Sequence, residues 1–136
     1  MIPLLIAAIV SLTNEFGTVD VDTFGANILS YVPAGGREMF FRQSEDYRTN
    51  QWYHGGVPVC WPWFGRIGKG DENIHGYAWK KQFSVKSRSD SAVTLELKTG
   101  FADLEYTIRL GAALELELKT FNGSDCDFPM GVAFHP

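Results

Sequence analysis

The chain has 136 residues, of which 45% are hydrophobic and 21% are charged, a composition typical of a globular protein with a core of its own. The formal net charge of −4 argues against a nucleic-acid-binding protein, because the sequence has no basic stripe to neutralise phosphates. The two cysteines, Cys60 and Cys126, have neither metal-ligand spacing nor a disulfide pattern. We therefore expect reduced thiols and a cytoplasmic protein.

The N-terminal segment Ile2–Val10 is apolar. It is too short to span a bilayer, and it lacks the positively charged beginning of a secretory signal. We therefore favour an initial strand or an aberrant start over a signal peptide, and we expect no association with membranes.

From Thr18 onward, apolar and polar residues alternate with a period of two, which is typical of strands with one buried face. Strands are expected at Thr18–Asp22, Asn27–Val32, Glu38–Arg42, Gln82–Lys86, Val93–Lys98, Leu104–Leu110 and Leu114–Lys119. The ranges 44–51 and 65–73 are predicted loops. No long helical pattern appears, so we predict an all-β antiparallel sandwich. Its expected buried face includes Leu95, Leu97, Tyr106, Ile108, Leu116 and Leu118.

One stretch departs from this alternation: His54–Gly65, with the sequence HGGVPVCWPWFG, followed by HGYAW at His75–Trp79. Its prolines remove main-chain donors, so it is no ordinary central strand. If it is extended, Trp61 and Trp63 share one face and Phe64 lies on the other. An aromatic ribbon flanked by histidines suits a sugar ring. The alternative is a proline-rich corner whose tryptophans fill the core.

The run Gly55–Gly65 followed by His-Gly-x-Ala at His75–Ala78 resembles the signature of the glucose-6-phosphate 1-epimerases, in the galactose-mutarotase-like superfamily. GANILSY at Gly25–Tyr31 and GVAFHP at Gly131–Pro136 extend the resemblance over residues 11–136. Members of that family are longer, and the chain resembles their N-terminal half. The resemblance implies that residues 1–136 form a single, incomplete domain of the galactose-mutarotase-like sandwich.

The same resemblance implies acid–base chemistry on a hexose or hexose 6-phosphate, without a cofactor. Ring opening needs a base for the anomeric hydroxyl and an acid for the ring oxygen, and imidazole suits such work near neutral pH. By resemblance, His135 is the general acid and His75 binds near the ring oxygen. The family's general base is a glutamate of the C-terminal half, which is absent from this chain. Catalysis by this chain alone is therefore an open question.

A zinc site made of His54, His75 and His135 is the alternative role for the three histidines. They lack close ligand spacing, so we expect no bound metal.

Two positions depart from the resembled family, which often has arginines where this chain has His54 and Trp79. Neither residue binds a phosphate bidentately, as an arginine does. His54 is expected to hydrogen-bond the sugar and Trp79 to stack on its ring or to lie in the core. Arg66 is a further candidate for an anionic group. The phosphorylation state of the sugar therefore stays open.

The sequence thus predicts an isomerase, an aldose or hexose-6-phosphate 1-epimerase, with His75 and His135 as catalytic residues and His54, His75, Trp79 and Arg66 as substrate-binding residues. The alternative is a non-catalytic carbohydrate-binding β-sandwich that lacks the base. An incomplete sandwich would expose apolar sheet surface, which we expect to promote self-association.

Overall fold

The structure is a computed structural model that describes residues 8–42, 55–67 and 74–136. His54, the predicted loop 44–51, most of the predicted loop 65–73 and the beginning of the apolar N-terminal segment lie outside these ranges. The strands are β1 (Ile9–Asn14), β2 (Gly17–Asp22), β3 (Asn27–Pro33), β4 (Val59–Cys60), β5 (Ser84–Arg88), β6 (Ala92–Lys98), β7 (Ala102–Leu110), β8 (Leu114–Asn122) and β9 (Ala133–Phe134). A single 3-10 turn, η1 (Ala78–Lys80), is the only helical element in the described part.

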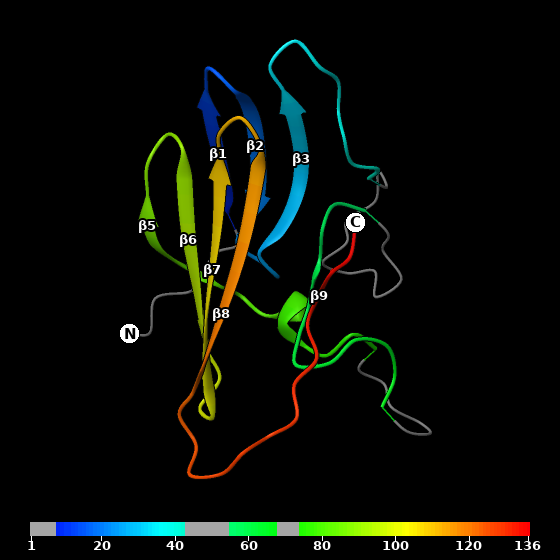
Figure 1. Ribbon diagram of the computed structural model, residues 1–136, viewed down its shortest axis with the longest axis vertical. Coiled ribbons are helices and arrows are strands. Elements are labelled where there is room, and N and C mark those ends of the chain that lie inside the picture. The colour runs from blue at the N-terminus through cyan, green and yellow to red at the C-terminus, as the bar shows by residue number, and fades with distance from the viewer. Residues whose placement is uncertain (1–7, 43–54, 68–73) are drawn as a thin grey trace.

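Two sheets form the body of the molecule, in the orders β1-β2-β3 and β5-β6-β7-β8 (Figure 1). Neighbouring strands in both sheets are consecutive in the chain and antiparallel. The short pair β4-β9, also antiparallel, lies beside them and joins two segments distant in sequence. These findings confirm the predicted all-β antiparallel fold.

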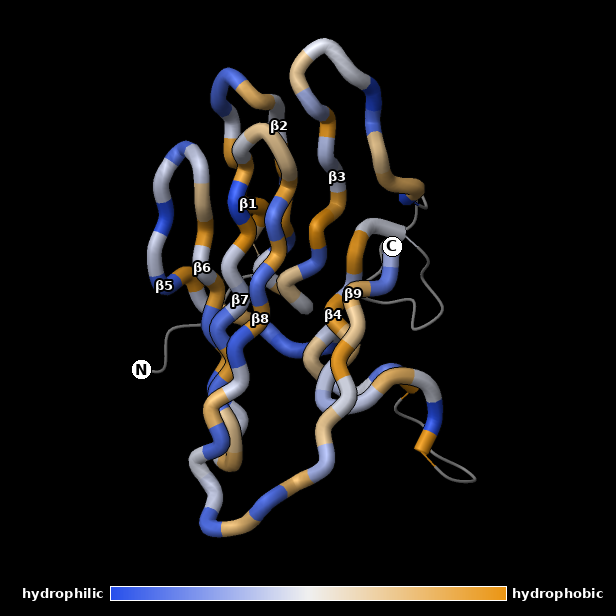
Figure 2. The backbone as a smooth tube through the Cα atoms, in the orientation of Figure 1, coloured by the Kyte–Doolittle hydropathy of each residue, from blue (hydrophilic) through white to orange (hydrophobic). Residues whose placement is uncertain are grey.

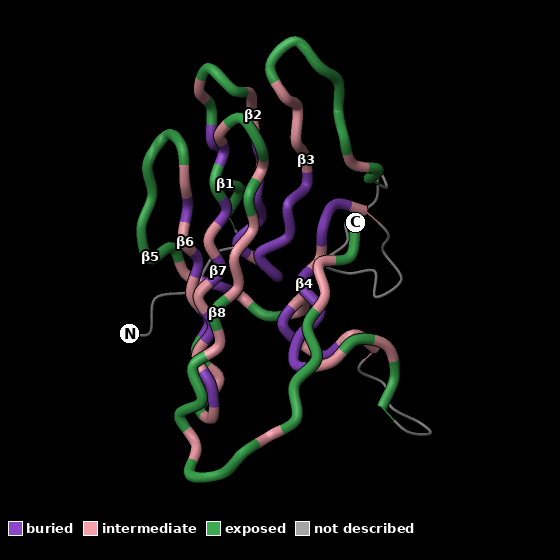
Figure 3. The backbone as a smooth tube through the Cα atoms, in the orientation of Figure 1, coloured by how far each residue is buried: buried purple, intermediate pink, exposed green. Residues whose placement is uncertain are grey.

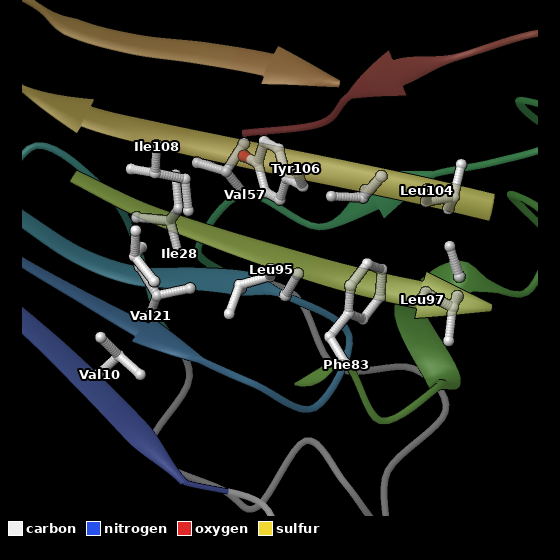
Figure 4. Close-up of a cluster of buried hydrophobic side chains, with 14 of the residues drawn as sticks. Val10, Val21, Ile28, Val57, Phe83, Leu95, Leu97, Leu104, Tyr106 and Ile108 are labelled. Atoms are coloured by element: carbon white, nitrogen blue, oxygen red, sulfur yellow. The ribbon is translucent and has the colours of Figure 1, made fainter. Parts of the chain in front are cut away.

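The core lies between the two larger sheets. Val10, Val21 and Ile28 from the first sheet meet residues of β6 and β7, with Phe83 among them (Figure 4). Apolar and polar side chains alternate most regularly along β2, β6 and β7, and the alternating colours of Figure 2 follow this pattern. This alternation places one face of each sheet in the core and leaves the other to solvent. The predicted strands at Thr18, Asn27, Gln82, Val93, Leu104 and Leu114 are all present, with bounds shifted by up to three residues.

Strand β8 is less covered than its sequence pattern predicts. Leu95, Leu97, Tyr106 and Ile108 are buried as expected. Leu116 and Leu118 are only partly buried, and no residue of β8 is fully buried (Figure 3). The prediction for these two leucines is therefore corrected. Strand β8 is the last strand of its sheet, so its inward face meets neighbours on one side only.

The strand expected at Glu38–Arg42 is absent, and this prediction was wrong. Met39 N–H donates to the carbonyl of Tyr31 (2.9 Å), while the Glu38 carboxylate accepts from the N–H groups of Tyr31 (2.9 Å) and Phe40 (3.1 Å) and from the Ser30 hydroxyl. Because a side chain takes donors that a neighbouring strand would otherwise satisfy, the segment contacts β3 through single hydrogen bonds and forms no ladder with it. Strand β1 supplies the third strand of the sheet instead.

Candidate functional site

The β4-β9 pair sets the position of His135. Val59 pairs with Phe134 and Cys60 with Ala133. The contact continues at both ends, where Gly131 N–H donates to the Pro62 carbonyl (2.8 Å) and His135 N–H donates to the Pro58 carbonyl (3.1 Å). The C-terminal segment is thereby aligned antiparallel to the aromatic motif, which fixes the backbone of His135 although its side chain is exposed.

Trp61 anchors this motif in the core. The side chain is fully buried, its ring stacks on Phe101 (centroids 5.8 Å apart, 16° between planes), and its indole N–H donates to the Met130 sulfur (3.2 Å). Trp61 and Trp63 both meet Tyr77 edge-on. Trp61 therefore takes the core role that was one of the two expectations for the tryptophans, whereas Trp63 is only partly buried.

His75 is held by a tight turn against the same motif. Its φ of 64° lies in the left-handed region, which is uncommon for a residue with a side chain. Gly76 follows with φ 72°, and a Cβ there would lie 2.1 Å from the Trp61 carbonyl oxygen. Only glycine permits this close approach. Tyr77 N–H then donates to the same carbonyl (3.0 Å), so the His-Gly pair is locked onto Trp61.

Three rings meet where these segments converge. The imidazoles of His75 and His135 lie edge to face with centroids 5.2 Å apart. Phe64 contacts both, at 4.7 Å from His75 and 5.4 Å from His135. Phe64 is 55% exposed, so the cluster of Phe64, His75 and His135, hereafter the histidine cluster, lies at the surface. It combines two proton-carrying side chains with an apolar ring face, a combination suited to a sugar ring.

The two histidines differ in electrostatics. The main-chain N–H of Gly65 donates to Nδ1 of the His75 ring (3.0 Å). The main-chain N–H of His75 donates to the Gly65 carbonyl (2.8 Å). A neutral imidazole that accepts at Nδ1 carries its proton on Nε2. Burial, and next the nearby His135, lower the pKa of His75 below its ordinary value of 6.5. Near neutral pH, His75 is therefore a neutral ring that offers Nε2–H as a donor.

Trp79 and Arg66 are the other predicted binding residues within the described ranges. Neither is one of the three rings of the histidine cluster. The Trp79 indole N–H donates to the Ile74 carbonyl (3.1 Å), and the Lys80 ammonium lies 4.6 Å from the centre of its ring. The side chain is partly buried. Arg66 is exposed and directly follows Gly65, whose amide and carbonyl both bond to His75.

Phe64 belongs to the histidine cluster and Gly65 and Pro58 hold it in place, although the sequence alone did not assign these three residues a site role. Phe64 supplies the apolar ring, Gly65 the main-chain donor that sets the His75 tautomer, and Pro58 the carbonyl that holds His135. All three lie inside the aromatic motif. Trp61 and Trp63 both contact Tyr77, whereas Phe64 contacts the two histidines. The roles of Gly65 and Pro58 depend on main-chain contacts, for which a sequence carries no side-chain signal.

The fold is similar to those of solved mutarotase-like structures. A galactose mutarotase-like protein from Lactobacillus casei matches with a TM-score of 0.77 and 22% identity, over 95% of this chain and 49% of that one. A galactose mutarotase related enzyme from Lactobacillus acidophilus matches with a TM-score of 0.70 and 21% identity, over 87% of this chain and 44% of that one. At these identities the likeness shows the fold alone.

Sequence relatives agree with the fold. The chain is 31% identical over 110 residues to a candidate glucose-6-phosphate 1-epimerase of Escherichia coli, and 28% identical over 109 residues to a protein of the same description from Salmonella typhimurium. The matched parts are 71% and 70% of this chain but 37% of either relative. The chain thus spans well under half the length of the curated relatives it matches.

The described ranges contain no helix long and apolar enough to cross a membrane.

The family pattern with the description aldose 1-epimerase matches residues 8–136, nearly the whole chain. This match agrees with the motif at Gly55–Gly65, the antiparallel fold and the sequence relatives. The chain belongs to the aldose 1-epimerase family.

Proposed function

We propose that the histidine cluster forms part of the sugar site of a 1-epimerase that interconverts the α and β anomers of a hexose or hexose 6-phosphate. The observation that carries the proposal is the contact between His75 and His135, whose ring centroids lie 5.2 Å apart beside Phe64. A cluster of this size spans the ring oxygen and the anomeric carbon of a single pyranose.

The two histidines are proposed to divide the chemistry. His75, neutral and protonated at Nε2, donates a hydrogen bond to the sugar and orients it. His135 delivers a proton to the ring oxygen as the bond between C1 and that oxygen breaks, while a base outside the described residues takes the proton of the anomeric hydroxyl. The open-chain aldehyde then rotates about C1–C2, and the reverse proton transfers close the ring on either face.

Arg66 is proposed to bind the phosphate of a hexose 6-phosphate. Its guanidinium offers paired donors suited to phosphate, and it is exposed next to the residue that holds His75. His54 and Trp79 complete the proposed sugar-binding set. Replacing Arg66 with Ala should weaken binding of glucose 6-phosphate while leaving binding of glucose unchanged. Equal weakening of both sugars, or of neither, would contradict this assignment.

The protein is proposed to act in the cytoplasm. Both cysteines are free, and Cys126 is exposed. Unpaired thiols of this kind persist in reducing compartments.

The reaction is tested by NMR exchange between the anomers of glucose, galactose and glucose 6-phosphate in the presence of the 136-residue chain. We expect slow catalysis, because the resemblance assigns no residue of this chain as the opposing base, which leaves one proton transfer to water. His135→Asn should lower the catalysed rate by about 10²-fold or more while sugar binding changes little. His75→Asn, which keeps an acceptor for Gly65 N–H and loses the Nε2 donor, should mainly weaken binding.

The sugar site itself is tested by the imidazole NMR signals of the two histidines. A bound sugar should shift the signals of both His75 and His135. An unchanged exchange rate in His135→Asn would make His135 a structural residue. Sugar binding to the chain with no catalysed exchange at all would favour the non-catalytic carbohydrate-binding alternative.

A further inference from the structure

Asn27 has a buried polar side chain at the first position of β3. It is 5% exposed, and it is one of three polar or charged residues that are buried in the described part of the chain, with Asp22 and Thr23. Its Oδ1 accepts from Val57 N–H (2.9 Å), in a buried hydrogen bond. Its Nδ2 donates to the Gly55 carbonyl (3.5 Å). One amide side chain thus binds the main chain of the aromatic motif on both sides of Gly56.

Gly56 shows how closely this turn rests on β3. Its φ is 68°, and a Cβ at this position would lie 2.2 Å from the Ile28 carbonyl oxygen and 2.7 Å from Asn27 Oδ1. The Ile28 carbonyl also accepts from Val57 N–H (2.9 Å). Because nothing larger than hydrogen fits between the turn and the strand, a change at Asn27 is transmitted directly to Gly55–Val57.

The next residue links this turn to the histidine cluster. The Pro58 carbonyl accepts from His135 N–H (3.1 Å), and Val59 pairs with Phe134. Proline has no N–H to hold its own main chain, so Val57 before it and β4 after it set the position of its carbonyl. Val57 itself is buried, forms a bridge with Ile28 and belongs to the same core cluster as Tyr106 (Figure 4).

We infer that Asn27 is a positioning residue for His135: it fixes the Gly55–Val57 turn, and through the Pro58 carbonyl it fixes the backbone from which the His135 imidazole projects. The consequence for catalysis rests on the function proposed above, whereas the positioning itself does not.

The experiment compares Asn27→Ala and Asn27→Asp with Thr23→Val in the full chain. Asn27→Ala removes both hydrogen bonds, and Asn27→Asp keeps the acceptor for Val57 but loses the donor to Gly55. Thr23 is the matched control, because its buried hydroxyl accepts from Ala8 N–H (2.9 Å) and from Gln82 Nε2 (2.7 Å). Thr23→Val therefore removes two partly buried hydrogen bonds, neither of which involves the turn.

Hydrogen exchange and NMR shifts give the readout. In Asn27→Ala, amide exchange at Val57 and His135 should be about tenfold faster than in the unchanged protein, and the imidazole signals of His135 should move. Asn27→Asp should change the amide exchange rate and the imidazole signals of His135 in the same direction, but by a smaller amount. Thr23→Val should lower global stability while leaving these signals in place.

Two results would overturn the inference: His135 signals and exchange that stay unchanged in both Asn27 variants, or equal changes in Thr23→Val. Glucose 6-phosphate is then added to each protein, and its binding to Asn27→Ala should be about tenfold weaker. If the unchanged chain binds no sugar, the proposed function fails, but the exchange data still decide whether Asn27 positions His135.

Discussion

His75 and His135 carry the same side chain in different surroundings. His75 sits in a left-handed turn and accepts a main-chain hydrogen bond at Nδ1, whereas the His135 side chain is exposed at the end of a short strand pair. Protonating His75 would place a hydrogen on Nδ1 facing the Gly65 N–H. Hydrogen bonding thus opposes the charged form of His75, in the same direction as burial.

The lowered pKa of His75 predicts a pH dependence of stability. Between the folded pKa and the ordinary value of 6.5, the unfolded chain binds more protons, so stability rises with pH across that window. The contribution is complete above 6.5, falls as the pH drops below 6.5 and levels off below the folded pKa. Urea unfolding measures the free energy of unfolding at about pH 7.5 and about pH 5.5. Its decrease from the higher to the lower pH should be larger for the unchanged protein than for His75→Gln. Equal losses would contradict the prediction.

The two thiols are predicted to differ in reactivity. Burial raises the pKa of Cys60 to about 11, and the thiolate is the reactive form, whereas Cys126 is exposed. A thiol reagent at neutral pH should modify one cysteine rapidly in the native protein and the second only after denaturation. Cys126→Ser should abolish the rapid phase. Two rapid thiols in the native protein would show that the β4-β9 pair opens readily.

At the scale of the elements, β7 and β8 show that a strand's position in its sheet determines how far its apolar residues are buried. Apolar and polar residues alternate over all nine positions of β7 and over the first six of β8, Leu114–Lys119. The apolar residues of β7 are buried between two neighbouring strands and the opposite sheet, while those of β8 are partly exposed at the edge. The alternation defines which face turns inward, and the neighbours determine how much of that face is covered.

Ile108 and Leu116 are a matched pair for measuring this difference, because they lie directly opposite each other across β7 and β8. Ile108→Ala removes a fully buried side chain and should lower the free energy of unfolding by about 2–5 kcal/mol. Leu116→Ala should cost clearly less, since part of that side chain already meets solvent. Denaturant unfolding of both variants measures the difference, and equal costs would mean that β8 is covered in solution.

At the scale of the whole molecule, the sandwich leaves apolar surface uncovered. Phe121 on β8 and Met130 and Val132 on the segment after it are 51%, 49% and 41% exposed. The mutarotase-like structures that it resembles are about twice as long, since the matches cover 49% and 44% of them. Exposed apolar residues beside an open sheet edge favour association between copies.

Self-association through these exposed apolar residues is therefore predicted. Sedimentation velocity should show a mean sedimentation coefficient that rises with protein concentration and, because the contact is apolar, persists at high salt. Phe121→Lys should shift the protein toward the monomer. Phe41→Lys is the control, because Phe41 is 72% exposed but lies in a different segment from β8. A monomer at every concentration, or an equal effect of both variants, would count against this surface.

Local patterns in the sequence determined the strands and the motif. The side-chain period of a strand is two regardless of its partners, so the three strands predicted between Val93 and Lys119 could be located before any pairing was known. The glycines and prolines of Gly55–Gly65 likewise mark a special backbone by their own covalent constraints. The resemblance that these residues carry indicated the family and the sandwich fold.

Only the tertiary structure decided what depends on distant partners. The Glu38–Arg42 segment has a strand-like sequence, but its Glu38 carboxylate accepts from Tyr31 N–H of β3 and from Phe40 N–H, in place of a main-chain ladder. Leu116 and Leu118 follow the buried pattern, yet an edge position leaves them partly exposed. His75 and His135 meet because β9 pairs with β4 and Gly76 packs on Trp61. The β4-β9 pairing and the Gly76–Trp61 contact join residues far apart in the chain, and their geometry is set by main-chain contacts that are nearly independent of side-chain identity.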